Sequence, residues 1–131
     1  MMRDPDALLP LTPVAFHILL ALAQGTCHGY AVMRQVSVAT PQTSHVGTTT
    51  IYRAISRLVA AGLVADAGKR PSRLDDDERR RYYRLTPWGL LVAQAEARRL
   101  AQLVGYARAA LPLADAEMKG DAASFQVAVR G

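Results

Sequence analysis

Cysteine is nearly absent from this 131-residue chain, which holds a single thiol, Cys27. One thiol cannot form an internal disulfide, and this fits a reducing compartment. The sequence also lacks a charged start that leads into an apolar signal segment, and no apolar run approaches the roughly 18 residues that a membrane span needs. We therefore expect a cytoplasmic protein with no membrane partner.

Signatures of catalysis and of metal binding are missing as well. No Ser/His/Asp set, glycine-rich phosphate loop or carboxylate pair stands out, so we expect no enzyme. The neighbours Cys27 and His28 do not have the usual spacing of zinc ligands. The acidic run at 75–78 lacks the glycine and the spacing of a calcium loop. We predict no metal and no cofactor.

Basic charge is in surplus, and it is concentrated in the middle of the chain. The formal net charge is +5, and residues 12–111 hold 13 basic and 6 acidic residues while both ends are slightly acidic. Half of the residues are hydrophobic, which is typical of a globular protein, and the length suits one domain with a modest core. A basic middle of this kind indicates a polyanionic partner.

Three helices are predicted before residue 62. Thr12-Pro13 is a cap followed by a proline, which starts a helix over 14–24, and Gly25 ends it. This helix is apolar on two sides, so one side can face its own core and the other, with Phe16 and Leu20, a second subunit. Further helices are expected at 29–38 and 48–61.

The third helix has two different faces. One face is an apolar stripe at helical spacing and is predicted to be buried: Ile51, Ile55, Leu58 and Val59. The opposite face carries hydroxyl and basic groups. Strands are expected at 63–67 and 80–86, and the polar segment 68–79 between them would form a hairpin. Helix, strand and charged hairpin in this order are typical of a winged helix-turn-helix, a mainly α fold with a small β-hairpin.

A fourth helix is predicted over 87–111, started by Thr86-Pro87 and ended before Pro112. Its seam has alternating spacings of four and three residues, as in a heptad repeat, and predicts close packing on a partner: Ala93, Ala97, Leu100, Val104, Ala107 and Leu111. We divide the chain into a loose lead-in (1–11), a winged-helix DNA-binding domain (12–86), a dimerisation helix (87–111) and a tail (112–131).

The candidate DNA-contacting residues lie on the second helix, the third helix and the hairpin. Arginine can pair with guanine in the major groove, threonine can meet a phosphate or a thymine methyl group, and hairpin arginines suit the DNA backbone. The set is Tyr30, Arg34, Thr48, Thr49, Thr50, Tyr52, Arg53, Ser56, Arg57, Lys69, Arg70, Arg73, Arg79, Arg80 and Arg81. Trp88, at the start of the fourth helix, is a candidate for the border of an effector pocket.

Several short segments, in this order and spacing, resemble the PadR family of bacterial transcriptional regulators in its short form with a single C-terminal helix. They are Leu11-Thr12-Pro13, His17-Ile18-Leu19-Leu20-Ala21-Leu22, His28-Gly29-Tyr30, Thr50-Ile51-Tyr52-Arg53-Ala54-Ile55-Ser56-Arg57-Leu58, Gly62-Leu63-Val64 and Asp77-Glu78-Arg79-Arg80-Arg81-Tyr82-Tyr83-Arg84-Leu85-Thr86-Pro87-Trp88-Gly89.

The resemblance implies a homodimeric winged helix in which the fourth helix packs with the first helix across the dimer. It also implies repression at a two-fold symmetric operator on double-stranded DNA, often released by a small aromatic or cationic molecule. The recognition helix of the family corresponds to Thr49–Arg57. The chain departs from the family at Thr48-Thr49, where members usually have Pro-Gly.

The sequence therefore favours a sequence-specific, DNA-binding transcriptional regulator that represses until an effector releases it. Two alternatives stay open. One is a winged-helix module that binds protein, which salt-insensitive binding would indicate. The other is a multidrug sensor with a hydrophobic ligand site at the dimer interface, which quenching of Trp88 by planar ligands would indicate.

Overall fold

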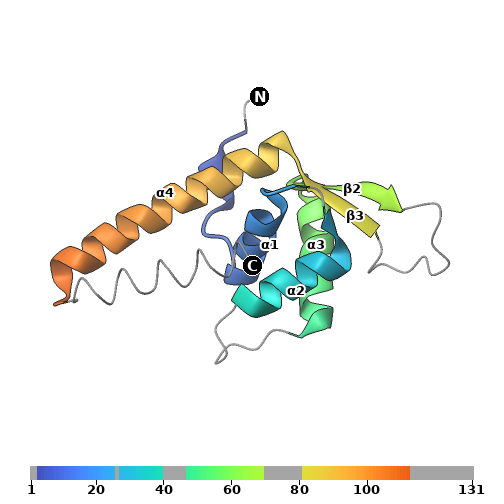
Figure 1. The fold of residues 1–131 in the computed structure, drawn as a ribbon. Helices are drawn as coiled ribbons and strands as arrows, with labels where there is room; N and C mark the ends of the chain where they lie inside the picture. Colours follow the sequence, from blue (N-terminus) through green and yellow to red (C-terminus); the bar gives the residue numbers. More distant parts are fainter. Residues whose placement is uncertain (1–2, 26, 40–46, 70–80, 113–131) are drawn as a thin grey trace.

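The structure, a computed structural model, describes residues 3–25, 27–39, 47–69 and 81–112. A short 3-10 helix comes first, and a winged-helix arrangement and a long final helix follow (Figure 1). The elements are η1 (Pro5–Leu8), α1 (Pro13–Leu22), β1 (Cys27–His28), α2 (Gly29–Ala39), α3 (Thr48–Ala60), β2 (Val64–Lys69), β3 (Arg81–Leu85) and α4 (Pro87–Ala110).

Helices α1 and α4 begin in the same way. In each, a threonine is the N-cap and a proline follows it, so the cap satisfies a free amide and the proline needs no partner. The hydroxyl oxygen of Thr12 accepts a hydrogen bond from the amide of Ala15 at 3.1 Å, and that of Thr86 accepts one from Gly89 at 2.9 Å. The predicted starts of both helices are confirmed.

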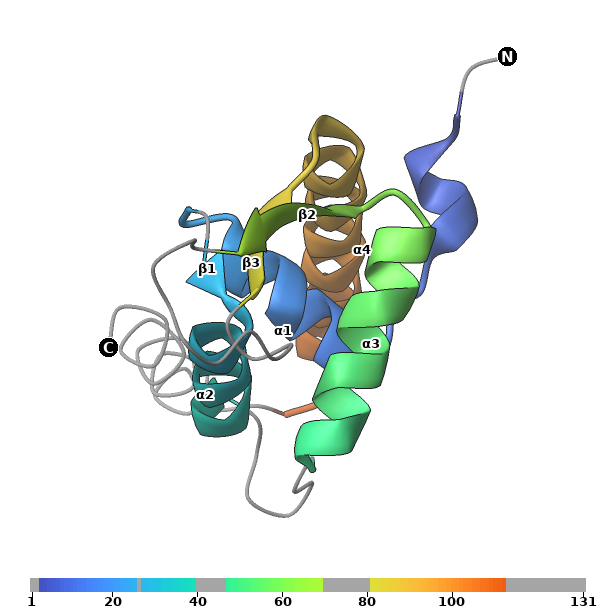
Figure 2. The same ribbon diagram turned by 90° about the vertical axis from the view of Figure 1, so that its right-hand side faces the viewer.

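The core is built around α1, which lies between α2 and α3 with α4 behind it (Figure 2). The stripe expected on α3 is buried at three of its four residues, and Val59 is half-buried. It forms one cluster with buried residues of α1 and α2: Ile18, Leu19, Leu22, Val32, Val36, Ile51, Ile55 and Leu58. Helix α1 contacts three helices of its own chain, and Leu20 on its second apolar side is half-buried. Phe16 packs against this core and is only half-buried.

The sheet has three strands rather than the two expected, in the order β1-β3-β2, all antiparallel. Cys27 pairs with Tyr83, and Val64 pairs with Leu85. A strand of two residues has no alternation to detect, so β1 left no signal in the sequence. Strand β2 runs on through Lys69, past a bulge at Gly68 whose φ of +92° suits glycine. The hairpin thus begins later than predicted, and most of it, residues 70–80, lies outside the described residues.

The lead-in was predicted to be loose, and this is wrong for residues 3–11. Segment η1 packs along α4, and Leu9 and Leu11 pack against the core. The amide of Leu11 also donates a hydrogen bond to Oε2 of Glu96 at 2.9 Å. Apolar contacts and the buried carboxylate of Glu96 hold the segment in place. The prediction relied on the prolines and aspartates of the segment and took neither of these into account.

Helix α4 divides into two halves. Its first half is buried against the winged-helix unit at Val92, Ala93 and Glu96, among others. Its second half extends away from that unit (Figure 1) and exposes Leu103 and Val104. The seam predicted for a partner is therefore mixed, since Ala93 is buried within the chain, Leu100 and Ala107 are half-buried, and the remaining members Ala97, Val104 and Leu111 are exposed. None of the helices in the described ranges is both long and apolar enough to span a membrane.

Candidate nucleic-acid interface

Helix α3 turns one complete face outward. Ile51, Ile55 and Leu58 fix its inner face in the core, with exposed fractions of 0%, 1% and 5%. Because a helix repeats every 3.6 residues, the residues on the side opposite this stripe point away from the core. They are exposed as the sequence predicted: Thr48, Thr49, Thr50, Arg53, Ser56 and Arg57. Tyr52 lies at the edge of this face, half-buried and packed against the core.

The start of α3 is exposed and carries no side-chain cap. Gly47 is the N-cap residue, with extended backbone, and as a glycine it has no side chain to accept a hydrogen bond from the first turn. Only the backbone of Gly47 is available to cap the helix from the N-cap position. Free amides at a helix N-terminus attract phosphate oxygens, and the hydroxyls of Thr48 and Thr49 lie beside them.

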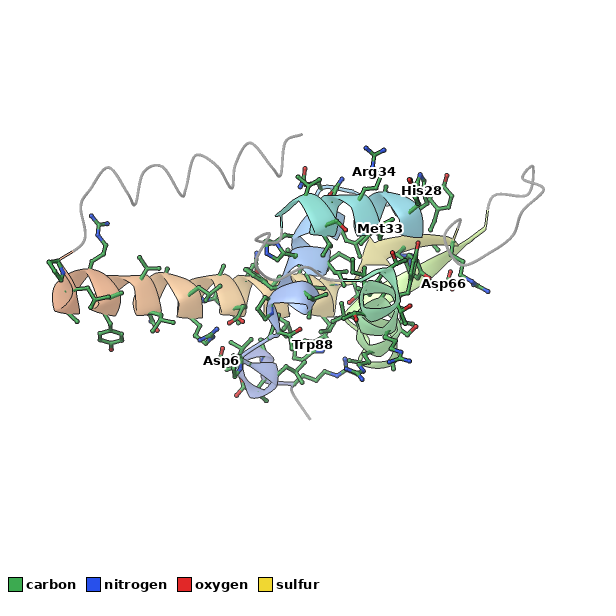
Figure 3. All side chains as sticks on the ribbon, turned by 90° about the horizontal axis from the view of Figure 1, so that it is seen from below. Asp6, His28, Met33, Arg34, Asp66 and Trp88 are labelled. Atoms are coloured by element: carbon green, nitrogen blue, oxygen red, sulfur yellow. The ribbon has the colours of Figure 1, made fainter. Side chains whose placement is uncertain are left out.

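Helix α2 adds a second exposed face beside the sheet. Tyr30 is 43% exposed, and Arg34 follows it one turn later, also exposed. Figure 3 shows Arg34 pointing away from the body of the molecule, near His28 at the start of the helix. His28 lies 6.5 Å from the Tyr30 ring and 5.7 Å from the Tyr82 ring, centroid to centroid. Its Nδ1 accepts a hydrogen bond from the amide of Ala31 at 3.1 Å, so His28 caps α2 rather than lying in a plain turn.

Of the predicted hairpin set, only Arg81 has a described side chain. The Lys69 side chain and Arg70, Arg73, Arg79 and Arg80 lie outside the described part of the chain. Arg81 NH1 lies 2.5 Å from Oδ2 of Asp66 across the two strands, and both side chains are about one-third exposed. This pair offsets part of the positive charge of Arg81. Arg84, which the sequence analysis did not select, is exposed on β3 because it alternates with the buried Tyr83.

All charged side chains of helices α1, α2 and α3 are basic. Between Asp6 and Asp66 the sequence contains no acidic residue. The basic residues in that interval are Arg34, Arg53 and Arg57, and all three are exposed. No carboxylate from the same stretch offsets their charge, so the charged side chains that α2 and α3 contribute to the surface are all positive. Counting acids along the chain could have found this signal from the sequence.

Residues 18–95 match the family model described as the transcriptional regulator PadR-like family. The chain belongs to this family. PadR-like regulators bind DNA and are typically dimeric, and they are transcription factors rather than enzymes. Among curated proteins, no relative matches this chain.

Solved structures share the winged-helix fold of this PadR-like regulator. A transcriptional regulator from Clostridium thermocellum aligns with a TM-score of 0.61 and 22% identity, over 86% of this chain and 100% of its own. A PadR family transcription regulator from Clostridium difficile gives 0.62 and 20%, over 74% and 96%. A zinc-responsive MarR family member from Lactococcus lactis gives 0.53 and 21%, over 97% and 80%. At these identities the likeness establishes the fold alone.

Two charged contacts of this PadR-like regulator lie away from α3 and were missed by the sequence analysis. Glu96 on α4 is 1% exposed, and its Oε1 accepts a hydrogen bond from Nε of Arg99 at 2.5 Å. That bond, with the one from the Leu11 amide, lowers the pKa of Glu96 although burial opposes it. Arg3 lies 5.3 Å from the centroid of the Trp88 ring. An isolated glutamate in a helix is usually solvated, so nothing in the local pattern marked Glu96.

Proposed function

We propose that this PadR-like regulator is a homodimeric repressor that places α3 of each subunit in the major groove of a two-fold symmetric operator. The observation that carries the proposal is the outer face of α3, where Arg53 and Arg57 stand exposed above a fully buried apolar stripe. A rigid helix that presents arginines and hydroxyls has what base recognition requires.

The remaining contacts follow from the positions around α3. Tyr30 and Arg34 of α2 face outward and suit phosphates, as do the hydroxyl groups at the start of α3. Arg81 and Arg84 extend the basic surface along β3. We assign base reading to Thr49–Arg57 and backbone contact to α2 and to the strands, with Lys69 and the hairpin arginines as further candidates.

A second copy of the chain is the partner proposed for α4. Leu103, Val104 and the C-cap residue Leu111 are 52%, 41% and 53% exposed, in the part of α4 that extends away from the winged-helix unit. Val104 and Leu111 are seven residues apart, which is one heptad, and a helix with such exposed apolar residues is stabilised when an equivalent helix covers it. We therefore propose that residues 12–86 form the DNA-binding domain and 87–111 the dimerisation helix, with Phe16 and Leu20 of α1 beside it.

Release by a small effector is the regulatory part of the proposal. Trp88 is half-buried beside the core and is the only tryptophan of the chain. Its ring face is covered by Arg3, whose guanidinium already provides a cation–π contact. A cationic aromatic effector that bound to this ring would compete with Arg3, and quenching of Trp88 fluorescence would report its binding.

The function is tested by selection from a random duplex library with the purified full-length protein, followed by binding measurements at two salt concentrations. Enrichment of one sequence in two inverted copies, with scrambled duplex unable to compete, is the expected result. Equal and salt-sensitive binding to all duplexes would reduce the interface to a basic surface. No binding at low salt would favour a protein-binding winged helix instead.

A further inference from the structure

The N-terminal segment bridges two parts of the molecule that have separate roles in the proposed function. We name residues 3–11 the N-terminal strap. The strap packs along α4 through η1, and it lies beside the end of α3 that leads into β2 (Figure 2). It is therefore in contact with the proposed dimerisation helix and close to the proposed recognition helix at the same time.

Arg3 forms the first contact of the strap. Its guanidinium carbon lies 5.3 Å from the centroid of Trp88 in the first turn of α4. The NH1 group of the same side chain lies 3.7 Å from the position that a Cβ would take at Gly62, in the turn after α3. One cation thus contacts the start of α4 through a cation–π interaction and lies near the turn that follows α3.

Glu96 forms the second contact. Its carboxylate is buried and accepts hydrogen bonds from the Leu11 amide at 2.9 Å and from Arg99 at 2.5 and 3.2 Å. A buried charge costs desolvation energy, and an apolar side chain of similar volume often gives equal or greater stability. What the carboxylate adds is directional bonding, because it holds one backbone amide of the strap at one place on α4.

The joint that the strap spans is tight. The hydroxyl group of Thr86 donates to the carbonyl of Gly62 at 2.7 Å and lies 3.1 Å from that of Leu63. Gly89 packs so closely that a Cβ there would lie 2.0 Å from the Leu63 carbonyl oxygen. The turn that follows α3 and the first turn of α4 therefore meet directly, and the strap lies against the same joint.

The angle at this joint matters because α4 is long. Its 24 residues span about 36 Å, so a rotation of about 10° at the joint would displace its far end by about 6 Å. One base pair occupies about 3.4 Å along the DNA axis. A small change of angle would therefore change the separation of the two α3 helices of a dimer by one or two base pairs.

We propose that Arg3 and Glu96 are positioning residues which, through the N-terminal strap, fix the angle between α3 and α4 and so select the spacing between operator half-sites. The proposal rests on the proposed function, since it requires dimers that bind paired half-sites. Neither residue contacts DNA in this scheme, and the base preference of each half-site belongs to α3 alone.

The test is the duplex selection repeated with Arg3→Ala and Glu96→Gln, followed by affinities for duplexes whose spacing is one base pair shorter or longer than the optimum. Both variants should select the same half-site sequence as the wild type, but discrimination between adjacent spacings should fall about fivefold, a typical coupling between sites. Arg98→Ala is the matched control, because it removes one exposed arginine from α4 and should leave the spacing preference unchanged.

A conservative variant and measurements of folding distinguish the possible outcomes of this test. Arg3→Lys should restore much of the discrimination, since it keeps a cation over Trp88. Helical content and the melting temperature show whether a variant folds, and Arg3→Ala, at an exposed position, tests the proposal if Glu96→Gln does not fold. An unchanged ranking of spacings in a folded Arg3→Ala dimer would overturn the inference while the proposed function stands. If the wild type enriches no paired half-sites, the proposed function fails and the inference fails with it.

Discussion

The described arginines of this chain differ in the carboxylates that lie beside them. Arg81 is paired with Asp66 at 2.5 Å, and Arg99 with Glu96 at the same distance. Arg53 and Arg57 lie on α3, within the stretch between residues 6 and 66 that contains no acid. A paired arginine has a fixed position and a partly neutralised charge, whereas no carboxylate of the described residues is paired with these two.

We expect Arg53→Ala and Arg57→Ala each to weaken binding to the selected operator by about 1–3 kcal/mol and to relax base preference at the position that each contacts. Both residues are exposed, so the fold should be unaffected. Affinity is measured by titration of operator and scrambled duplexes at fixed salt, with Arg98→Ala as the control for loss of one positive charge. If both variants keep the affinity and the preference of the wild type, α3 does not read the operator.

A second residue-scale prediction concerns His17 in α1. Burial lowers the pKa of His17, so the folded protein binds this proton less readily than the unfolded chain. Above about pH 6.5, the pKa of an unperturbed histidine, His17 is neutral in both states and the fold has its full stability with respect to this group. As the pH falls from there toward the folded pKa, the unfolded chain binds the proton first, and this stability is lost. The free energy of unfolding, measured in urea between pH 7.5 and 5.5, should therefore decrease. His17→Gln should reduce this slope, and parallel curves for the two proteins would contradict the assignment.

At the scale of elements, the helices were predictable from the sequence because their apolar residues repeat at regular spacing. Strand β1 and the strap were not, because individual contacts fix them. Helices α1, α2, α3 and α4 fall within about two residues of their predicted bounds, because caps, prolines and apolar stripes mark them. Strand β1 and the strap have no such repeat. The strap is fixed by Glu96, whose buried position depends on Leu11, 85 residues away in the sequence. The outer face of α3 was predictable for the same reason as its buried face, since one implies the other.

The contact between α4 and the turn before β2 gives an element-scale prediction. In Gly89→Ala the new methyl carbon would lie 2.0 Å from the Leu63 carbonyl oxygen and 2.9 Å from Cδ1 of Leu85. That carbonyl also accepts a hydrogen bond from the Thr86 amide at 3.1 Å, so it cannot easily move. We expect a loss of roughly 1–3 kcal/mol in the free energy of unfolding, the usual cost of overpacking.

The control for Gly89→Ala is Gly105→Ala on the same helix. A Cβ at Gly105 would meet no atom within 4 Å, and alanine favours the helix over glycine by about 1 kcal/mol. The second variant should therefore be as stable as the wild type or more so. Both are compared by thermal and urea unfolding at equal protein concentration, and equal effects at the two positions would show that the contact with Leu63 is not tight.

At the scale of the whole molecule, the structure consists of a packed body and a projecting helix. The body buries its apolar residues within one chain, as α1 shows by contacting α2, α3 and α4. The second half of α4 leaves Val104 and Tyr106 exposed by 41% and 74%. Exposed apolar residues that form a contiguous patch indicate an interaction site, whereas scattered ones do not, and these residues lie on the part of α4 that we propose as the subunit contact.

Val104→Asp should convert the proposed dimer to a monomer, because burying an unpaired carboxylate in the interface costs about 3–5 kcal/mol. Val104 lies beyond the buried half of α4, so the monomer should keep its helical content. Gln102→Asp introduces the same charge at another exposed position, away from the predicted seam, and should remain dimeric.

Sedimentation velocity gives the mass of each variant, and titration with a paired operator and with a single half-site gives the effect on binding. A monomeric Val104→Asp that retains only its weak half-site affinity would show that α4 joins the two recognition helices. A Val104→Asp protein that stays dimeric would place the subunit contact elsewhere.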